Sequence, residues 1–237
     1  MKYTKVFLFA FMVTSICFAF PTEQVRKFDQ RYQLNSLNQK LVDNFGDGYE
    51  NLYGVRNFRV VLRGILYRGG ANNAYNKYEK RNNQNPLPTM GLKNLCQQDF
   101  KSAVYLYQTN FSTAPKKVKC QTLENTENEI NYLQMNGLDQ GNTVAFLEMI
   151  YQAIKGEIPS PIYMHCWNGW HASGLVSTLA LRQFCDVDAK EALQYWTQNT
   201  DGNSEGYSSI KSRIQSFKPL SQFKITPEEK SQICLQN

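Results

Sequence analysis

A cysteine and a histidine stand side by side in a segment with the pattern of an anion-binding loop. The segment IYMHCWNGWHASG, residues 162–174, places His165 and Cys166 at the end of a short apolar run. A polar loop containing Gly169 follows, and Ser173 stands at the start of a second apolar run. The β-branched and aromatic residues of the first run predict a strand, and the second run predicts a helix.

The order of strand, loop and helix has a chemical use. Backbone N–H groups of a loop that closes onto a helix N-terminus converge, and the helix dipole adds partial positive charge, so an anion is stabilised there. The same field favours a thiolate, which makes Cys166 a candidate nucleophile. Ser173 can donate a hydrogen bond to that sulfur. The structural alternative is that Cys166 and His165 are ordinary buried core residues.

The segment resembles the signature of the cysteine-dependent phosphatase superfamily, the protein tyrosine and dual-specificity phosphatases. That signature reads His-Cys, five residues, Arg, Ser or Thr, and Gly. The matching positions are His165, Cys166, Gly169, Ser173 and Gly174. The resemblance implies that Cys166 attacks phosphorus to form a phosphocysteine and that His165 orients the loop. It implies a phosphate-binding loop made of Trp167, Asn168, Gly169, Trp170, His171, Ala172 and Gly174.

Ala172 departs from the signature, because it stands where the family has an arginine that grips two phosphate oxygens. A protonated His171, or an arginine from elsewhere, would have to supply the missing charge. The candidates are Arg68, Arg182 and Arg213. We favour Arg68 as the accessory cation, because the Tyr-Arg-Gly-Gly stretch at 67–70 resembles the entry of bacterial dual-specificity-type domains.

Asp139 is the candidate general acid. It lies in a polar loop 27 positions before Cys166 (166 − 139), and the resemblance implies an aspartic acid at about this distance that protonates the leaving oxygen. An aspartate beside glycine is also ordinary turn chemistry or a helix N-cap.

Other chemistries remain to be compared. Without the signature arginine, the chain is either a hydrolase of phosphate monoesters or a pseudophosphatase that binds a phosphorylated or anionic ligand or partner. Trp167 and Trp170 also suit a recognition surface for a sugar or aromatic ring. A cysteine protease needs a histidine remote in sequence, whereas both histidines flank Cys166. His165, Cys166 and His171 lack a fourth zinc ligand at sensible spacing. We expect no metal and no cofactor.

The alternation of helical and strand patterns predicts an α/β domain. With the resemblance, the expected fold is the cysteine-phosphatase fold, with a central mixed or parallel sheet of about four to five strands flanked by helices. We divide the chain into a signal peptide (1–19), an N-terminal helical extension (20–56) and the phosphatase-like domain (57–237). Within the extension, the apolar spacing approaches that of a helix between residues 34 and 45. Residues 71–88, rich in Asn, Lys and Pro, predict an exposed loop.

The first residues predict export. Lys2 and Lys5 precede an apolar run that is short for a membrane span, and Ala19 suits signal peptidase cleavage. An uncleaved anchor is the alternative, and Ile16 disfavours a lipoprotein. We expect a secreted or periplasmic protein, of bacterial origin, without a membrane span after cleavage.

Charge and cysteines limit the partners and the compartment. The net charge of +6 falls to about +4 without Lys2 and Lys5, too mild to indicate nucleic acid. The expected partner is a phosphorylated protein or a small phosphate ester, and the oligomeric state is not indicated. In an oxidising compartment four cysteines can pair in three ways, or stay reduced, and leave Cys166 as the odd thiol. The four are Cys96, Cys120, Cys185 and Cys234.

Overall fold

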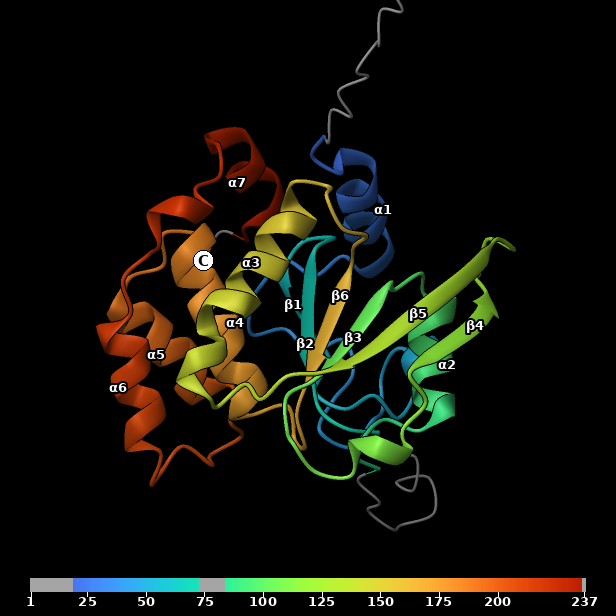
Figure 1. The fold of residues 1–237 in the computed structure, drawn as a ribbon, viewed down its shortest axis with the longest axis horizontal. Helices are drawn as coiled ribbons and strands as arrows, with labels where there is room; N and C mark the ends of the chain where they lie inside the picture. The colour runs from blue at the N-terminus through green and yellow to red at the C-terminus, as the bar shows by residue number, and fades with distance from the viewer. Residues whose placement is uncertain (1–18, 73–83, 236–237) are drawn as a thin grey trace, which may run out of the picture.

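A mixed sheet lies at the centre of the protein (Figure 1). The computed structural model describes residues 19–72 and 84–235, and within them six strands pair in the order β1-β2-β6-β3-β5-β4. The inner four run parallel, and the two edge strands are antiparallel to their neighbours. The strands are β1 (Arg59–Leu62), β2 (Leu66–Gly69), β3 (Ser102–Tyr105), β4 (Lys117–Gln121), β5 (Glu127–Gln134) and β6 (Ile162–His165). The expected α/β sheet is confirmed, with six strands where four to five were expected.

Helices cover both faces of this sheet. Tyr67 and Arg68 are consecutive strand residues, so their side chains point to opposite faces. Phe28 of α1 packs against Tyr67, whereas Gly174 of α4 lies against Arg68. Figure 1 accordingly shows α3 to α6 together on one side and α2 beside β4 and β5. The helices are α1 (Thr22–Tyr32), α2 (Thr89–Gln97), α3 (Thr143–Ile154), α4 (Ala172–Phe184), α5 (Ala189–Gln198), α6 (Ser208–Ser216) and α7 (Pro227–Ile233).

Short 3-10 turns complete the chain between these elements. They are η1 (Glu50–Leu52), η3 (Phe111–Thr113), η4 (Gln140–Asn142) and η5 (Ser221–Phe223). Since the four inner strands are parallel, their carboxyl ends meet at one edge of the sheet. The loops after β2, β3, β5 and β6 therefore share that edge, and the loop after β6 carries the phosphatase-like signature.

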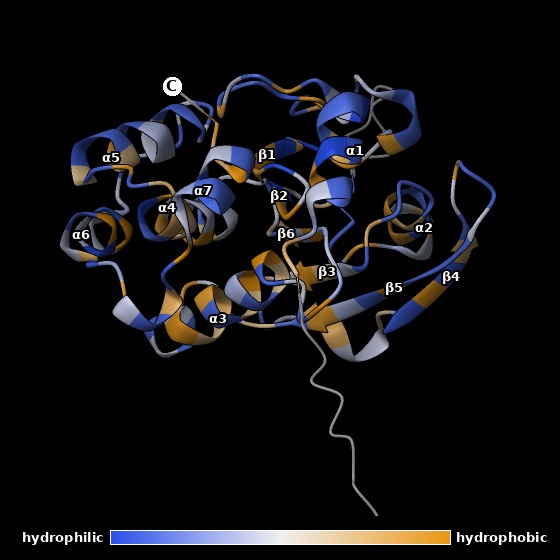
Figure 2. Cartoon of the chain, turned by 90° about the horizontal axis from the view of Figure 1, so that it is seen from above, coloured by the Kyte–Doolittle hydropathy of each residue, from blue (hydrophilic) through white to orange (hydrophobic). Residues whose placement is uncertain are grey.

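The helix of the N-terminal extension lies earlier than predicted. Helix α1 ends at Tyr32, and Gln33 takes a left-handed conformation with φ of 49°. The apolar spacing between residues 34 and 45 was wrongly interpreted as helical. Leu34, Leu37 and Val42 are instead buried from an irregular segment. They join the same hydrophobic cluster as the sheet, and the exposed face of α1 is hydrophilic (Figure 2).

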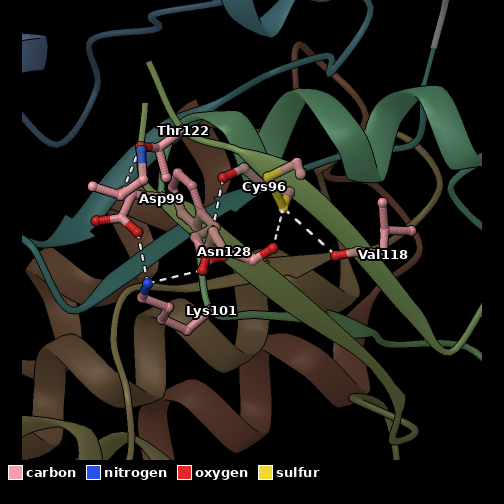
Figure 3. Close-up of a disulfide and its surroundings, with 9 residues drawn as sticks. Cys96, Asp99, Lys101, Val118, Thr122 and Asn128 are labelled. Atoms are coloured by element: carbon pink, nitrogen blue, oxygen red, sulfur yellow. Dashed lines mark hydrogen bonds and ion pairs between the residues drawn. A yellow bond between two sulfur atoms is a disulfide. The ribbon is translucent and has the colours of Figure 1, made fainter. Parts of the chain in front are cut away.

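Two disulfides connect helices to more distant parts of the chain. Cys96 of α2 pairs with Cys120 of β4, and Cys185 after α4 pairs with Cys234. This is one of the three possible connectivities. Around the first bridge, Asn128 donates to the carbonyl of Cys96 and accepts from Lys101 (Figure 3). Cys166 is the free cysteine of the described part of the chain.

Other local expectations have mixed outcomes. Asp188 caps α5 by accepting from the N–H groups of Lys190 and Glu191, a role that aspartate favours at a helix N-terminus. Residues 1–18 and 73–83, which include most of the predicted signal peptide and surface loop, lie outside the described residues. In the part that is described, no helix has the length and apolar character needed to cross a bilayer.

We predict that both disulfides contribute to stability, because they close loops with sequence separations of 24 and 49 residues. A cross-link over loops of this length limits the unfolded chain, so each double serine variant should lose about 3–4 kcal/mol of unfolding free energy. Urea unfolding of Cys96→Ser/Cys120→Ser and of Cys185→Ser/Cys234→Ser, beside the oxidised wild type, measures this. A midpoint that does not move in either variant contradicts the prediction.

Candidate active site

Cys166 lies directly after β6, at the carboxyl edge of the sheet. Its N–H donates to the carbonyl of Gly69 at 3.3 Å, and its side chain is 1% exposed. Its sulfur is 3.4 Å from the hydroxyl oxygen of Ser173, in the first turn of α4. The strand, loop and helix predicted around Cys166 are therefore present, and the structure brings Cys166 and Ser173 together.

The carbonyl groups of the first loop residues point outward to donors on neighbouring elements. The carbonyl of Trp167 accepts from the N–H of Ala71 at 2.8 Å. The carbonyl of Asn168 accepts from the side-chain amide of Asn57 at 2.7 Å. Segments just before β1 and just after β2 thus hold the start of the loop.

Arg68 holds the middle of the loop in the same way. Its Nη2 donates to the carbonyl of Gly169 and to that of Trp170, and its Nη1 donates to the Tyr195 hydroxyl of α5 at 3.0 Å. Arg68 is fully buried and pairs in the sheet with Met164 of β6. The predicted accessory cation therefore contacts the outer side of the loop.

Because the N–H and C=O of a peptide unit point in opposite directions, outward carbonyls leave inward N–H groups. Among the described residues, no acceptor is bonded by the N–H groups of Trp167, Gly169, Trp170, His171, Ala172 and Ser173. They belong to the segment between the end of β6 and the first turn of α4. Such a nest of unpaired donors is a site for an anion.

Two glycines allow the loop to lie against β2. A Cβ atom on Gly70 would be 2.7 Å from the backbone of Asn168, and one on Gly169 would be 2.7 Å from the backbone of Gly69. Gly169 also has a φ of 76°, which favours glycine. The Tyr-Arg-Gly-Gly stretch therefore has a steric role beside its arginine.

His165 orients the first peptide of the loop. The N–H of Leu87 donates to the Tyr132 hydroxyl at 2.8 Å, so that hydroxyl is free to donate its own hydrogen to Nε2 of His165, also at 2.8 Å. The remaining hydrogen is then on Nδ1 and points to the Cys166 carbonyl at 3.2 Å. Burial lowers the pKa of His165 to about 3, so the ring is neutral at physiological pH.

His171, one alternative for the missing charge, contacts a segment outside the loop. Burial lowers its pKa, and its Nε2 lies 2.7 Å from the carbonyl of Asn203. Its ring stacks on Tyr207 with centroids 3.7 Å apart. Neutral His171 therefore anchors the end of the loop to the segment before α6.

Arg182 and Arg213 are also engaged elsewhere. Arg182 donates to the carbonyl of Ile214 in α6. Arg213 donates to the carbonyl of Leu138 at 2.7 Å and to the Thr143 hydroxyl at 3.1 Å. Of the three arginines considered, Arg68 is the one that contacts the loop.

Asp139 follows β5 and therefore lies at the same edge of the sheet as Cys166. Its side chain accepts from the N–H of Gly141 at 2.9 Å and caps η4, as the turn interpretation has it. The residue is exposed. The structure gives Asp139 no direct contact with Cys166 or Ser173, so its role in proton transfer stays a prediction.

The two tryptophans of the loop have different surroundings. Trp167 is 48% exposed beside the thiol, whereas Trp170 is mostly buried and donates its indole N–H to Asp201 at 3.0 Å. Tyr107, two residues after β3, also lies near the site, since burial and the charge of Cys166 raise the pKa of its phenol. Trp167 and Tyr107 thus give the site aromatic surface.

Several residues that support the loop were not identified from the sequence. Asn57, Tyr132 and Arg56 are distant in sequence from Cys166, and Arg56 donates to the Asn168 side chain at 2.9 Å. The sequence signals for these residues were weak. Asn57 is an asparagine just before a strand, where its φ is a left-handed 54°, and the other two are polar residues in or beside apolar strands. As for a metal, the described residues contain no group of three His, Cys, Asp or Glu side chains placed to hold one.

Comparison with known proteins finds similarity to a small number of solved structures at low sequence identity. Neither a protein-family model nor a curated protein matches the sequence. TpbA of P. aeruginosa is 16% identical, with a TM-score of 0.42 over 65% of this chain and 83% of that one. A TpbA variant in complex with pTyr gives 14% and 0.36, over 63% and 85%. PTPMT1 gives 13% and 0.37, over 66% and 97%.

We predict that acid destabilises the protein through His165. Its folded pKa of about 3 lies below the ordinary value near 6.5, so the unfolded state binds the proton first as pH falls. The unfolding free energy should drop between pH 6.5 and about 3, by up to ~1.4 kcal/mol per pH unit from this residue. Urea unfolding across that range, compared with His165→Asn, measures the difference. Parallel curves for the two proteins would sink the prediction.

Proposed function

We propose that this chain is an exported hydrolase of phosphate monoesters that works through a phosphocysteine on Cys166. The observation that carries the proposal is the nest of inward N–H groups around the thiol, held by outward-bonded carbonyls. A tetrahedral phosphoryl group offers several anionic oxygens to such a nest. In this proposal, the sulfur of Cys166 attacks the phosphorus of that group.

The proposed reaction has two steps. In the first, the Cys166 sulfur forms a bond to phosphorus while the bond from phosphorus to the ester oxygen breaks, and Asp139 gives its proton to the leaving alcohol. In the second, water attacks the phosphocysteine, Asp139 accepts a proton from it, and phosphate leaves from a regenerated thiolate. Ser173 stabilises that thiolate from 3.4 Å. The proposed substrates are a phosphorylated protein, a phosphoinositide or a small phosphate ester.

The alternative is a pseudophosphatase that binds a phosphorylated or anionic ligand without turnover. The observation that favours it is Ala172, buried at the first position of α4. Loss of one preorganised stabiliser of transition-state charge costs about 3–4 kcal/mol, or about 100- to 1000-fold in rate. The nest binds an anion in either case, so the two functions differ in turnover and share a ligand.

Export is part of the proposal. Two disulfides in the described residues support it, since such bonds persist in oxidising compartments. The expected cleavage after Ala19 would release a secreted or periplasmic protein.

We predict that an aryl phosphate such as p-nitrophenyl phosphate is hydrolysed by the wild type and not by Cys166→Ser, because serine is the weaker nucleophile. Orthovanadate should compete, since it places oxygens in the same nest. Steady-state kinetics with a vanadate series measure both effects. Turnover that survives in Cys166→Ser contradicts the phosphocysteine mechanism.

We also predict that Ala172→Arg raises kcat/KM by about 100-fold, because a guanidinium at this position restores a bidentate phosphate contact. The control is Ser231→Arg, which adds the same charge at an exposed position of α7. A silent wild type with an active Ala172→Arg variant would select the ligand-binding alternative. No vanadate binding to either protein would contradict both functions.

A further inference from the structure

Arg59 of β1 is a buried cation to which the proposed chemistry assigns no task. Its side chain is fully buried, and its Nε, Nη1 and Nη2 have no hydrogen-bond partner among the described residues. No carboxylate of the described chain forms an ion pair with it. A buried guanidinium without an acceptor costs free energy, so its retention needs a reason.

The sheet places Arg59 next to the arginine that holds the loop. Arg59 pairs directly with Arg68 across β1 and β2, so both side chains are on the face covered by α4. Burial, and then the charge of Arg68, lower the pKa of Arg59 to about 10. Arg59 is therefore still cationic at neutral pH, and its charge and that of Arg68 repel each other unless an anion lies near both.

The carboxylate that attracts Arg59 is already engaged by other groups. Asp201 attracts Arg59, but its carboxylate bonds Lys40 at 2.7 Å and the Trp170 indole at 3.0 Å. The negative charge of Asp201 that attracts Arg59 is therefore partly neutralised by Lys40. The outer side of the loop therefore has an excess of positive charge. Arg68 is part of it and donates hydrogen bonds to the carbonyls of Gly169 and Trp170.

We propose that Arg59 is a positioning residue that acts through Arg68 and supplies part of the positive potential that the signature arginine would give at Ala172. The inference rests on the proposed function, because it takes the nest as a phosphate site. The ligand it favours is a doubly charged tetrahedral oxyanion over a singly charged or neutral one. In the interior, a charge acts over a longer distance than in water, since solvent and salt screen it less.

The test uses the ratio of two alkylation rates at Cys166. Iodoacetate and iodoacetamide are close in size, but the first is an anion and the second is neutral. Both react with the same thiolate, so their rate ratio reports the local potential and not the thiolate fraction or its accessibility. Arg59→Met should lower the ratio at Cys166, followed by peptide mass spectrometry, by about threefold or more. It should weaken orthovanadate binding by a similar factor.

Stability provides the second readout. Replacing an unpaired buried charge by a methionine should raise the midpoint of thermal unfolding by about 2–4 °C. Arg59→Gln, which keeps polarity, is the second variant. Arg63→Met is the matched control: Arg63 is in the turn between β1 and β2, where it pairs with Asp29, and it should leave the ratio unchanged.

Each outcome of these experiments either supports or overturns the proposed role of Arg59. A lower ratio in both Arg59 variants, with stability kept or raised, supports the proposal. An unchanged ratio of the iodoacetate and iodoacetamide rates overturns the proposal, and so does an equal fall of that ratio in Arg63→Met. If both rates fall in the same proportion, the ratio is unchanged and Arg59 has a structural role. Failure of the proposed catalysis is distinct, because it appears as absent turnover while the ratio still depends on Arg59.

Discussion

The loop after β6 depends on one constraint: its carbonyl groups must find donors on its outer side. Ala71, Asn57 and Arg68 supply them from three places in the chain. If these donors were missing, the peptide planes would be free to rotate and the N–H groups would no longer converge. The conformation of the loop is therefore a product of the surrounding packing, and the proposed anion site depends on it as much as on Cys166.

This constraint explains why the N-terminal extension packs so closely on the sheet. Asn44 accepts from Arg56 and from Asn57, the two residues that bind the Asn168 side chain and backbone. Leu34, Leu37 and Val42 bury the same segment in the common core. The extension thus belongs to the support of the loop, although it lies more than a hundred residues before Cys166 in the chain.

The part of this site that could be predicted is the part encoded locally. His165, Cys166, Gly169 and Ser173 lie within nine residues, and the strand before them and the helix after them have clear patterns. Of the outer donors, Arg68 was singled out from the Tyr-Arg-Gly-Gly stretch, whereas Asn57 and Ala71 could not be predicted, because strand pairing decides which segments lie beside the loop. Periodicity also failed between residues 34 and 45, where an irregular backbone that follows the left-handed Gln33 buries Leu34 and Leu37 at nearly helical spacing. Asp139 shows a different limit, because the sequence alone does not distinguish an aspartate that caps a helix from one that acts as a general acid.

The close approach of Gly70 and Gly169 to neighbouring backbone has a consequence for recognising related proteins. A side chain at either position would meet main-chain atoms at 2.7 Å, and main chain cannot move aside as a flexible side chain can. Substitution at Ala172 changes which charge contacts a ligand, whereas substitution at these glycines changes whether the loop can close at all. Chains related to this one, whatever residue they have at the position of Ala172, are therefore better recognised by the paired glycines at the end of β2 and the glycine three residues after the cysteine. The backbone geometry of the loop is then a better marker of the relationship than the charge at position 172.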